Sequence, residues 1–261
     1  MSTVEQSDSK LISLEILGSI AILNLQRSPM NQINDEFLRQ LAAALAAIES
    51  DESVAIVRIT SNQRAFSAGA DLEMVHQRVG TNEGARAMME TARLFHRVYD
   101  RLAALPAVTI AEIGGHALGG GLELALACDL RVAAHGARLG LPEAKVGLLP
   151  GAGGTQRLTR LCGPGISARL ILGGEVVDGK EAERIGLVQW SIDAEELGAK
   201  VDAIVERIAG LSPPALRQCK VCIHHASSMN PAGAEAEISG IGELMMTTEA
   251  ARRVDKFVTK S

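Results

Sequence analysis

Residues 112–157 read EIGGHALGGGLELALACDLRVAAHGARLGLPEAKVGLLPGAGGTQR, and this stretch decides how the rest of the chain is interpreted. It carries two glycine clusters, at 119–121 and 151–154, with the carboxylates Glu123 and Glu143 between them. Consecutive glycines let a backbone approach a ligand closely and present bare N–H groups. Two carboxyl groups beside such a site can act as acid and base.

The upstream segment 65–71, AFSAGAD, has the same small-residue character. Neither glycine cluster is followed by the Lys-Ser/Thr pair of a nucleotide P-loop, and neither has the G-x-G-x-x-G spacing of a dinucleotide site. Backbone N–H groups from two separate segments can instead hold an oxygen that becomes negative during a reaction. We predict Ala68 and Gly120 as such donors, although the spacing alone fits simple tight turns equally well.

The two glutamates have unusual surroundings. Glu123 falls in the first turn of an apolar helix predicted over 122–128, where the helix N-terminus stabilises a carboxylate. Glu143 follows Pro142 in an apolar loop. Each residue alone fits an ordinary surface position. Together they predict a two-carboxyl site in which different environments separate the two pKa values.

The composition limits the class of protein. The 261 residues are 47% hydrophobic and only 2% aromatic, so we expect one large aliphatic core. The net charge of −5, with no basic run, excludes a nucleic-acid partner. We find no apolar leader and no run of about 18 apolar residues, and therefore expect a cytoplasmic protein without membrane contact. Four cysteines in a chain of this size fit reduced thiols.

Strand and helix patterns alternate over residues 1–193, whereas residues 194–261 are helical only. This predicts an α/β core over 1–193 with a helical C-terminal appendage over 194–261, which the family resemblance given below implies to be the oligomerisation region of a core that carries the active site. A helical pattern over 72–105 is interrupted at 80–84, where we expect a mobile break. The predicted strands cover 11–16, 20–25, 54–60, 108–113, 130–134 and 188–192.

In this order along the chain, several motifs resemble the enoyl-CoA hydratase/isomerase (crotonase) family. The likeness spans nearly the whole sequence and rests on the set of motifs, because no single one is specific. The motifs are FSAGADL at 66–72, GHALGGGLELA at 115–125, CD at 128–129, PE at 142–143 and GLLPGAGGTQRL at 147–158.

The resemblance implies a spiral of ββα units with C-terminal helices used in a homotrimer or a dimer of trimers. It also implies an acyl-CoA substrate, with no metal and no redox cofactor. Ala68 and Gly120 match the oxyanion donors, and Glu123 and Glu143 match the glutamate pair of the hydratase branch. The substrate-binding segment matches Ala68, Gly69, Ala70, Asp71 and Leu72 together with Gly120. Arg27 is a further candidate for a CoA phosphate contact.

This chain departs from the family pattern at Glu112 and Gly114, where a small apolar residue and Asn are usual. The C-terminal tail lacks the common Lys-Arg-Lys-Pro ending, and we keep Phe257 and Lys260 as candidates for the CoA of a neighbouring subunit. Two other functions stay open. One is a Δ3-Δ2-enoyl-CoA isomerase or another crotonase-type lyase, and the other is a CoA-ester-binding subunit without activity.

A zinc site is a weaker interpretation of Cys219 and Cys222 with the histidines at 224–225. The spacing is too short for a zinc finger and no second ligand pair exists, so we expect packing roles and no metal.

Overall fold

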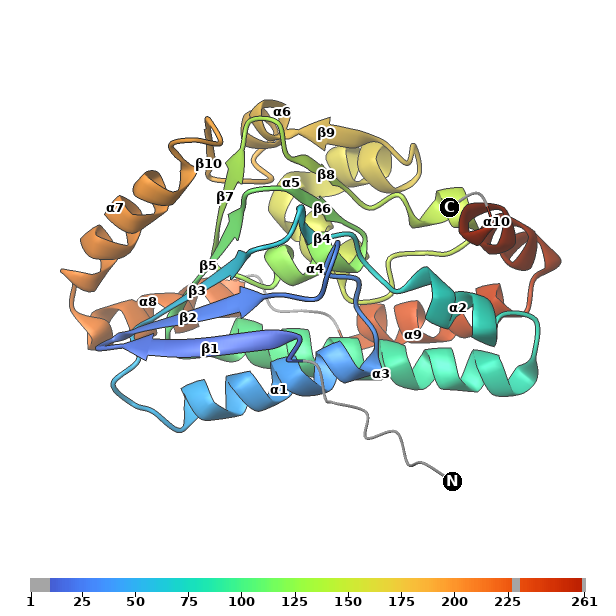
Figure 1. The fold of residues 1–261 in the computed structure, drawn as a ribbon, viewed down its shortest axis with the longest axis horizontal. Coiled ribbons are helices and arrows are strands. Elements are labelled where there is room, and N and C mark those ends of the chain that lie inside the picture. The colour runs from blue at the N-terminus through green and yellow to red at the C-terminus, as the bar shows by residue number, and fades with distance from the viewer. Residues whose placement is uncertain (1–9, 227–230, 260–261) are drawn as a thin grey trace, which may run out of the picture.

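The computed structural model describes residues 10–226 and 231–259 (Figure 1). Its strands form a six-stranded sheet in the order β1-β2-β3-β5-β7-β10 and a four-stranded sheet in the order β4-β6-β8-β9. The strands are β1 (Ile12–Leu17), β2 (Ile20–Leu25), β3 (Ile56–Ser61), β4 (Ala65–Ser67), β5 (Val108–Ile113), β6 (His116–Leu118), β7 (Leu130–Ala134), β8 (Arg138–Gly140), β9 (Val176–Asp178) and β10 (Trp190–Ile192).

The chain builds these sheets by repeating one unit. In the pairs β3-β4, β5-β6 and β7-β8, the first strand joins the large sheet and the second joins the small one, and a helix follows each pair. Successive first strands are parallel, as are β4, β6 and β8. This repetition is the predicted spiral of ββα units. The helices are α1 (Asp35–Glu49), α2 (Leu72–Arg78), α3 (Asn82–Ala104), α4 (Gly120–Leu126), η1 (Glu143–Val146), α5 (Gly154–Ile171), α6 (Gly179–Arg184), α7 (Leu197–Ala209), α8 (Pro213–Ala226), α9 (Pro231–Met245) and α10 (Thr248–Val258).

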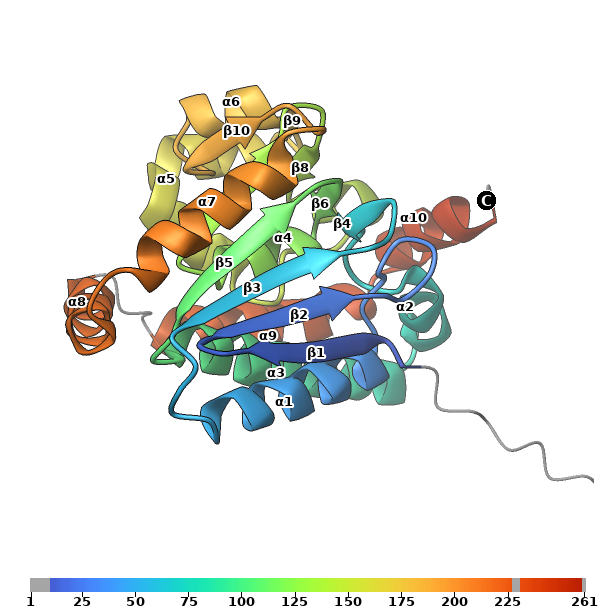
Figure 2. The ribbon, with the colours of Figure 1, turned by 60° about the vertical axis from the view of Figure 1, so that its left-hand side comes forward.

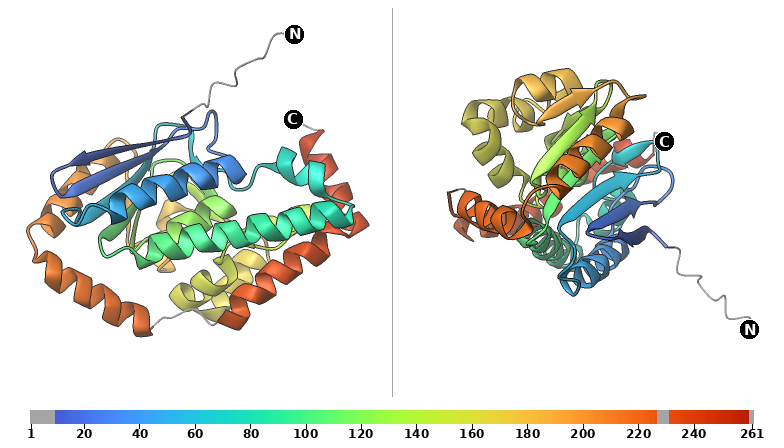
Figure 3. Two further views of the ribbon diagram at one scale, coloured as in Figure 1. Left: turned by 90° about the horizontal axis from the view of Figure 1, so that it is seen from below. Right: turned by 90° about the vertical axis from the view of Figure 1, so that its left-hand side faces the viewer.

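The first unit follows directly from the sequence. Gly18 takes a left-handed φ of 61° between two apolar runs, which gives the predicted antiparallel hairpin. The Asn34 side chain accepts from the Phe37 N–H and caps α1, and the apolar face of α1 packs against β1 and α3. Figure 3 shows α3 running between α1 and α9, both of which it contacts.

The predicted break in the 72–105 helix lies at residues 79–81, between α2 and α3. The structure ties this corner down at several points. The Gly80 N–H donates to the Met245 carbonyl at 2.8 Å, and Arg78 bonds both Asp35 and Thr91 at 2.7 Å. Both helices of this segment contribute to the pocket described below.

The C-terminal helices pack on the core rather than standing apart from it. Helix α7 contacts β3 and β7, and Figure 2 shows it in front of the large sheet. Helix α9 contacts α3, and α10 contacts α2 and η1. Helices α9 and α10 therefore wrap around the end of the molecule where the glycine clusters lie. Within residues 10–226 and 231–259, no helix is long and apolar enough to cross a bilayer.

Candidate active site

Asn31 fixes the loop that follows β4. It is completely buried and has a left-handed φ of 50°. Its side-chain amide lies within hydrogen-bonding distance of the Ala65 and Phe66 carbonyls, at 3.2 and 3.1 Å. Its own carbonyl accepts from the Ser67 hydroxyl at 2.7 Å. Strand β4 and the residues after it are thereby held against the 27–34 loop.

In segment 68–71, three of the four consecutive N–H groups already donate to protein acceptors. The Ala68 N–H donates to the Met30 carbonyl at 2.9 Å. Because an amide hydrogen serves one strong acceptor well, the structure corrects the prediction of Ala68 as an oxyanion donor. The other two bonds run from Gly69 to Ser67 Oγ at 3.2 Å and from Asp71 to the Ile33 carbonyl at 2.9 Å.

Ala70 supplies the remaining N–H of this segment. Ile33 and Ala70 form a parallel bridge in which the Gly69 carbonyl and the Asp71 N–H face Ile33. The N–H of Ala70 therefore points to the opposite side, because backbone directions alternate along an extended segment. A Cβ built on Gly120 would lie 3.6 Å from the Ala70 nitrogen. The structure thus brings Ala70, not Ala68, beside the first glycine cluster.

Gly120 begins α4, so its N–H has no acceptor within the helix. Gly119 caps this helix with a φ of 52°, which favours glycine. The Tyr99 hydroxyl, fully buried, donates to the Gly120 carbonyl at 2.9 Å. Burial and the nearby Glu123 raise the pKa of Tyr99 well above its usual range, so the hydroxyl stays a donor. Tyr99 therefore holds this end of α4 in place.

Glu123 lies one turn into α4 and is only 2% exposed. Its Oε1 accepts from the N–H groups of Ala152 and Gly154, both at 2.8 Å. Gly154 is the first residue of α5, so the carboxyl group also faces the positive end of that helix. Two N–H donors and a helix terminus stabilise the charged form of a carboxyl group. The second glycine cluster thus serves to hold Glu123.

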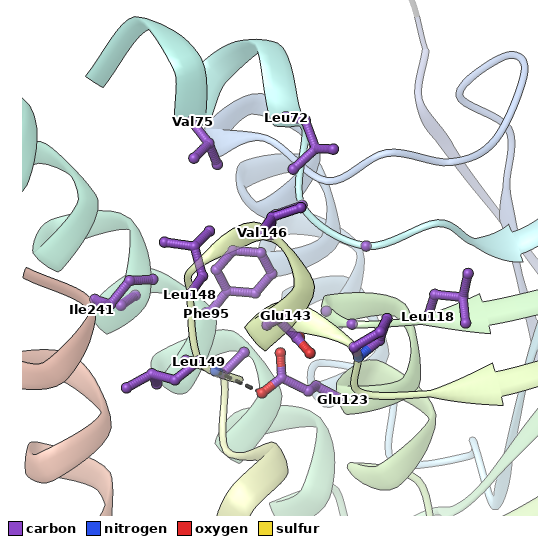
Figure 4. A pocket seen from close by; sticks show the side chains of 18 of the residues that line it. Leu72, Val75, Phe95, Leu118, Glu123, Glu143, Val146, Leu148, Leu149 and Ile241 are labelled. Carbon is purple, nitrogen blue, oxygen red and sulfur yellow. Dashed lines mark hydrogen bonds between the residues drawn. The ribbon is translucent and has the colours of Figure 1, made fainter. Parts of the chain in front are cut away.

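Glu143 begins the short helix η1 and packs over the first glycine cluster. A Cβ built on Gly119 would lie 3.0 Å from Glu143 Oε1 and, at the φ of this glycine, would also be strained. Figure 4 shows the carboxyl groups of Glu143 and Glu123 next to one another in the pocket. The structure therefore brings the two predicted glutamates together beside Ala70 and Gly120.

These groups line a cavity of about 210 Å³ whose walls are largely apolar. Segments far apart in the sequence meet there: the 68–72 loop, α3, the 142–152 segment and α9. The predicted residues Gly69 and Leu72 lie in its wall. Met88, which the sequence suggested as core or acyl-pocket filler, also lies in the wall. Sequence analysis did not assign the other apolar lining residues, for which no motif exists: Val75, Ala92, Phe95, Val146, Leu148, Leu149 and Ile241.

Arg27 and Asp71 form an ion pair below this loop. Arg27 Nη2 lies 2.6 Å from Asp71 Oδ2, and Nη1 donates to the Gln32 carbonyl at 2.6 Å. The other oxygen of Asp71 accepts from the Glu73 N–H and caps α2. The structure thus gives Arg27 a role in bracing the loop, and its contact with a CoA phosphate stays a prediction.

The two departures near the glycine cluster do not disturb it. Glu112 lies on the face of the large sheet that α7 covers, where its carboxylate is 2.6 Å from Arg58 Nε. Arg58 also pairs with Asp202 of α7 at 2.6 Å. A Cβ at Gly114 would meet only Leu197 Cδ2, at an ordinary 3.5 Å. Glu112 therefore anchors α7, and Gly114 meets no steric requirement for glycine.

The two tail candidates are not placed in the site. Phe257 belongs to α10, and only the backbone of this residue is described. Lys260 lies outside the described residues. What the structure does show is that α10 packs against η1 of the same chain. A Cβ on Gly147 would lie 2.8 Å from the Ala250 Cα atom. The last helix is thus in close contact with the loop that carries Glu143.

The family model described as enoyl-CoA hydratase/isomerase matches residues 15–261. This chain belongs to the enoyl-CoA hydratase/isomerase family. It is 35% identical over 251 residues to a probable enoyl-CoA hydratase of Bacillus subtilis, covering 95% of this chain and 96% of that one. It is 38% identical to a crotonyl-CoA hydratase of Syntrophomonas wolfei, covering 80% and 79%.

Solved structures agree with this assignment. The Pseudomonas aeruginosa protein DspI has a TM-score of 0.78 and 36% identity, covering 99% of this chain and 100% of its own. An enoyl-CoA hydratase of Bacillus halodurans has a TM-score of 0.87 and 26% identity, covering 94% and 99%. The crotonase fold expected from the sequence is confirmed, and the family acts on acyl-CoA substrates.

Proposed function

We propose that this chain is an enoyl-CoA hydratase, which adds water reversibly across the 2,3 double bond of a 2-enoyl-CoA to give a 3-hydroxyacyl-CoA. The observation that carries the proposal is the juxtaposition of four groups. The carboxyl groups of Glu123 and Glu143 lie side by side, and the N–H groups of Ala70 and Gly120 lie at the same end of one apolar pocket.

In this mechanism the thioester carbonyl accepts from the Ala70 and Gly120 N–H groups. The bonds polarise the conjugated double bond and stabilise the enolate that forms when water attacks C3. Losing one such donor typically costs about 3 kcal/mol of transition-state stabilisation. Tyr99 contributes indirectly by holding the Gly120 carbonyl.

Glu123 is the base of the proposed reaction. Its Oε1 is committed to the N–H groups of Ala152 and Gly154, which favour the ionised form, and the carboxylate takes a proton from the attacking water. Glu143 enters protonated and gives its proton to C2. The water oxygen thus ends on C3 with one of its protons, its other proton ends on Glu123, and the proton of Glu143 ends on C2. Proton exchange with solvent then returns Glu123 to the ionised form and Glu143 to the protonated form, and no electrons are exchanged. The proposal therefore includes no redox cofactor and no metal.

The remaining parts of the proposal concern binding and assembly. Segment 68–72 contributes to the acyl-thioester site, and Arg27 is kept as a candidate contact for the CoA phosphates. Helices α7–α10 are proposed to take part in trimer contacts, and α9 and α10 also close the pocket of their own chain. A cytoplasmic location completes the proposal.

Crotonyl-CoA hydration, followed by loss of the enoyl-thioester absorbance, tests the assignment. We expect Glu123→Gln and Glu143→Gln each to lower kcat by orders of magnitude while the melting temperature changes little. Glu90→Gln is the matched control, because Glu90 is an exposed α3 residue that pairs with Arg93 and does not line the described pocket. Near-normal hydration in either catalytic variant refutes the assignment.

An isomerase is separated from a hydratase by its substrate. A Δ3-Δ2-isomerase moves one proton between C2 and C4 and needs no second carboxyl group to handle water. Incubation with 3-enoyl-CoA and 2-enoyl-CoA in parallel distinguishes the two, since the isomerase produces 2-enoyl-CoA that then accumulates. The paired carboxyl groups favour the hydratase.

A further inference from the structure

The apolar pocket continues well past the two carboxyl groups. In crotonyl-CoA a single methyl group lies beyond C3, whereas here the wall extends along Phe95 and Leu148 to Ile241 (Figure 4). The cavity of about 210 Å³ exceeds the roughly 150 Å³ in which a protein interior can hold benzene, with its six carbons. By the same packing, the space accommodates a chain of about eight carbons.

We propose that the preferred substrates are medium-chain 2-enoyl-CoA thioesters and that Ile241 sets the upper limit of chain length. This inference rests on the proposed hydratase function and adds to it the class of acyl chain. The name of the crotonyl-CoA hydratase relative does not anticipate it. The limit on chain length is argued from the contacts that α9 makes with the pocket.

Among the residues of α9 whose side chains are described, Ile241 lines the pocket, and it is flanked by glycines. A Cβ on Gly240 would lie 2.7 Å from Leu149 Cδ2, and one on Gly242 would lie 2.6 Å from Met89 Sδ. The two glycines let the helix backbone lie flush against its neighbours. Of the described α9 side chains, the isoleucine therefore forms the wall at this point.

The position of Ile241 is fixed relative to the chemistry. Its Cδ1 atom would lie 3.1 Å from a Cβ built on Gly151, the residue before Ala152. The N–H of Ala152 in turn holds Glu123. Ile241 therefore packs against the backbone next to the residue that holds Glu123, in the same pocket wall as Leu149 and Ala152.

Ile241 is also held rigidly from behind. It is 7% exposed and belongs to a hydrophobic cluster separate from the main core, which joins α2, α3, η1, α9 and α10. The Gly80 N–H adds a backbone bond to Met245 at the end of α9. Because this cluster fixes α9, an acyl chain that is too long cannot push Ile241 aside without disturbing the packing of five helices.

The test measures kcat/KM for straight 2-enoyl-CoA substrates of increasing length, from crotonyl upward. For the wild-type chain we expect kcat/KM to rise about fourfold for each buried methylene up to about eight carbons, and to fall at least tenfold beyond the limit. Ile241→Ala removes the end wall and is expected to move the optimum upward by two or more carbons. Ile241→Phe fills the end of the pocket and is expected to move it downward.

Ile238→Ala is the matched control. Ile238 lies one turn earlier on α9 and is 6% exposed in the same cluster, but it is not part of the lining. We expect a lower melting temperature and an unchanged chain-length profile. Because Ile241→Phe and Ile241→Ala change volume in opposite directions, failure of one to fold leaves the other as the test.

The outcomes separate the two proposals. If the wild-type chain hydrates crotonyl-CoA with the highest kcat/KM, the chain-length inference alone is overturned. The same holds if the Ile241 variants keep the wild-type chain-length profile, as Ile238→Ala is expected to do. A chain that hydrates no enoyl-CoA of any length overturns the proposed function and this inference with it.

Discussion

Gly154 allows the most direct test of how the second glycine cluster acts. A Cβ at this position would lie 2.8 Å from Glu123 Oε1, the oxygen that accepts from the Gly154 N–H, and 2.9 Å from Leu141 Cδ1. To reach the 3.4 Å of an ordinary contact, the carboxylate must move by about 0.6 Å. Glu123 is 2% exposed and Leu141 is fully buried, so this displacement has little room.

The expected effect of Gly154→Ala is therefore larger on catalysis than on folding. A misplacement of about 1 Å in a reacting group costs roughly a hundredfold in rate, so we expect kcat to fall by about ten- to a hundredfold. Overpacking of this kind costs about 1–3 kcal/mol of stability, or a few degrees in melting temperature for a chain of this size. Steady-state hydration of a 2-enoyl-CoA and thermal unfolding measure the two effects.

Gly165→Ala is the control on the same helix. A Cβ at Gly165 meets no atom within 4 Å, and the residue has no positive φ. We expect unchanged kcat and a gain of about 0.4–1 kcal/mol, because alanine restricts the unfolded chain more than glycine does. If Gly154→Ala retains wild-type kcat, or if both variants lose activity equally, the steric role assigned to Gly154 is refuted.

Three further predictions concern stability and titration. Tyr99 is the single tyrosine, and burial and the nearby Glu123 raise its pKa, so tyrosinate absorbance should stay absent above pH 10 until the chain unfolds. The free energy of unfolding should fall as pH rises above about 10, because only the unfolded state ionises there. Tyrosinate absorbance of the folded chain near pH 10 would contradict the burial of Tyr99. Gly147→Val places side-chain atoms against Ala250 and pushes η1 away from α10, so it should lower both the melting temperature and kcat. A wild-type kcat would show that the contact between Gly147 and Ala250 does not position Glu143. Burial raises the pKa of the Cys128 thiol to about 12, so a thiol reagent should modify the exposed cysteines of α8 rapidly and Cys128 only on unfolding; a fast reaction of Cys128 in native buffer would contradict this.

Helices α9 and α10 make the active site depend on a part of the chain that carries no motif. The loop bearing Glu143 contacts α10 through Gly147, and Ile241 of α9 lines the apolar pocket. The region that the family resemblance implies to be used in oligomerisation therefore also lines the candidate site within its own chain. Any trimer contact made by α9 or α10 would therefore involve helices that also line the candidate site.

The sequence by itself determined the elements with strong local signals. The Gly18 hairpin, the Asn34 cap of α1 and the Asp71 cap of α2 follow from residue types whose backbone or side-chain chemistry acts within a few positions. It also identified Glu123, Glu143 and Gly120, which the fold brings together. The three-residue strands β4, β6, β8 and β9 were missed because such short segments have no measurable periodicity.

Only the tertiary structure decided the rest, since it depends on contacts between distant segments. Ala68 and Ala70 stand two residues apart in the same small-residue segment of the sequence. They differ because Met30 accepts the N–H of one, whereas the bridge to Ile33 turns the other toward Gly120. In the same way, the sequence around Ile241 carries no motif, and only the packing of α9 shows that this residue lines the pocket. Residue chemistry is local, but the choice of which N–H or methyl group faces the substrate is made by packing across the whole chain.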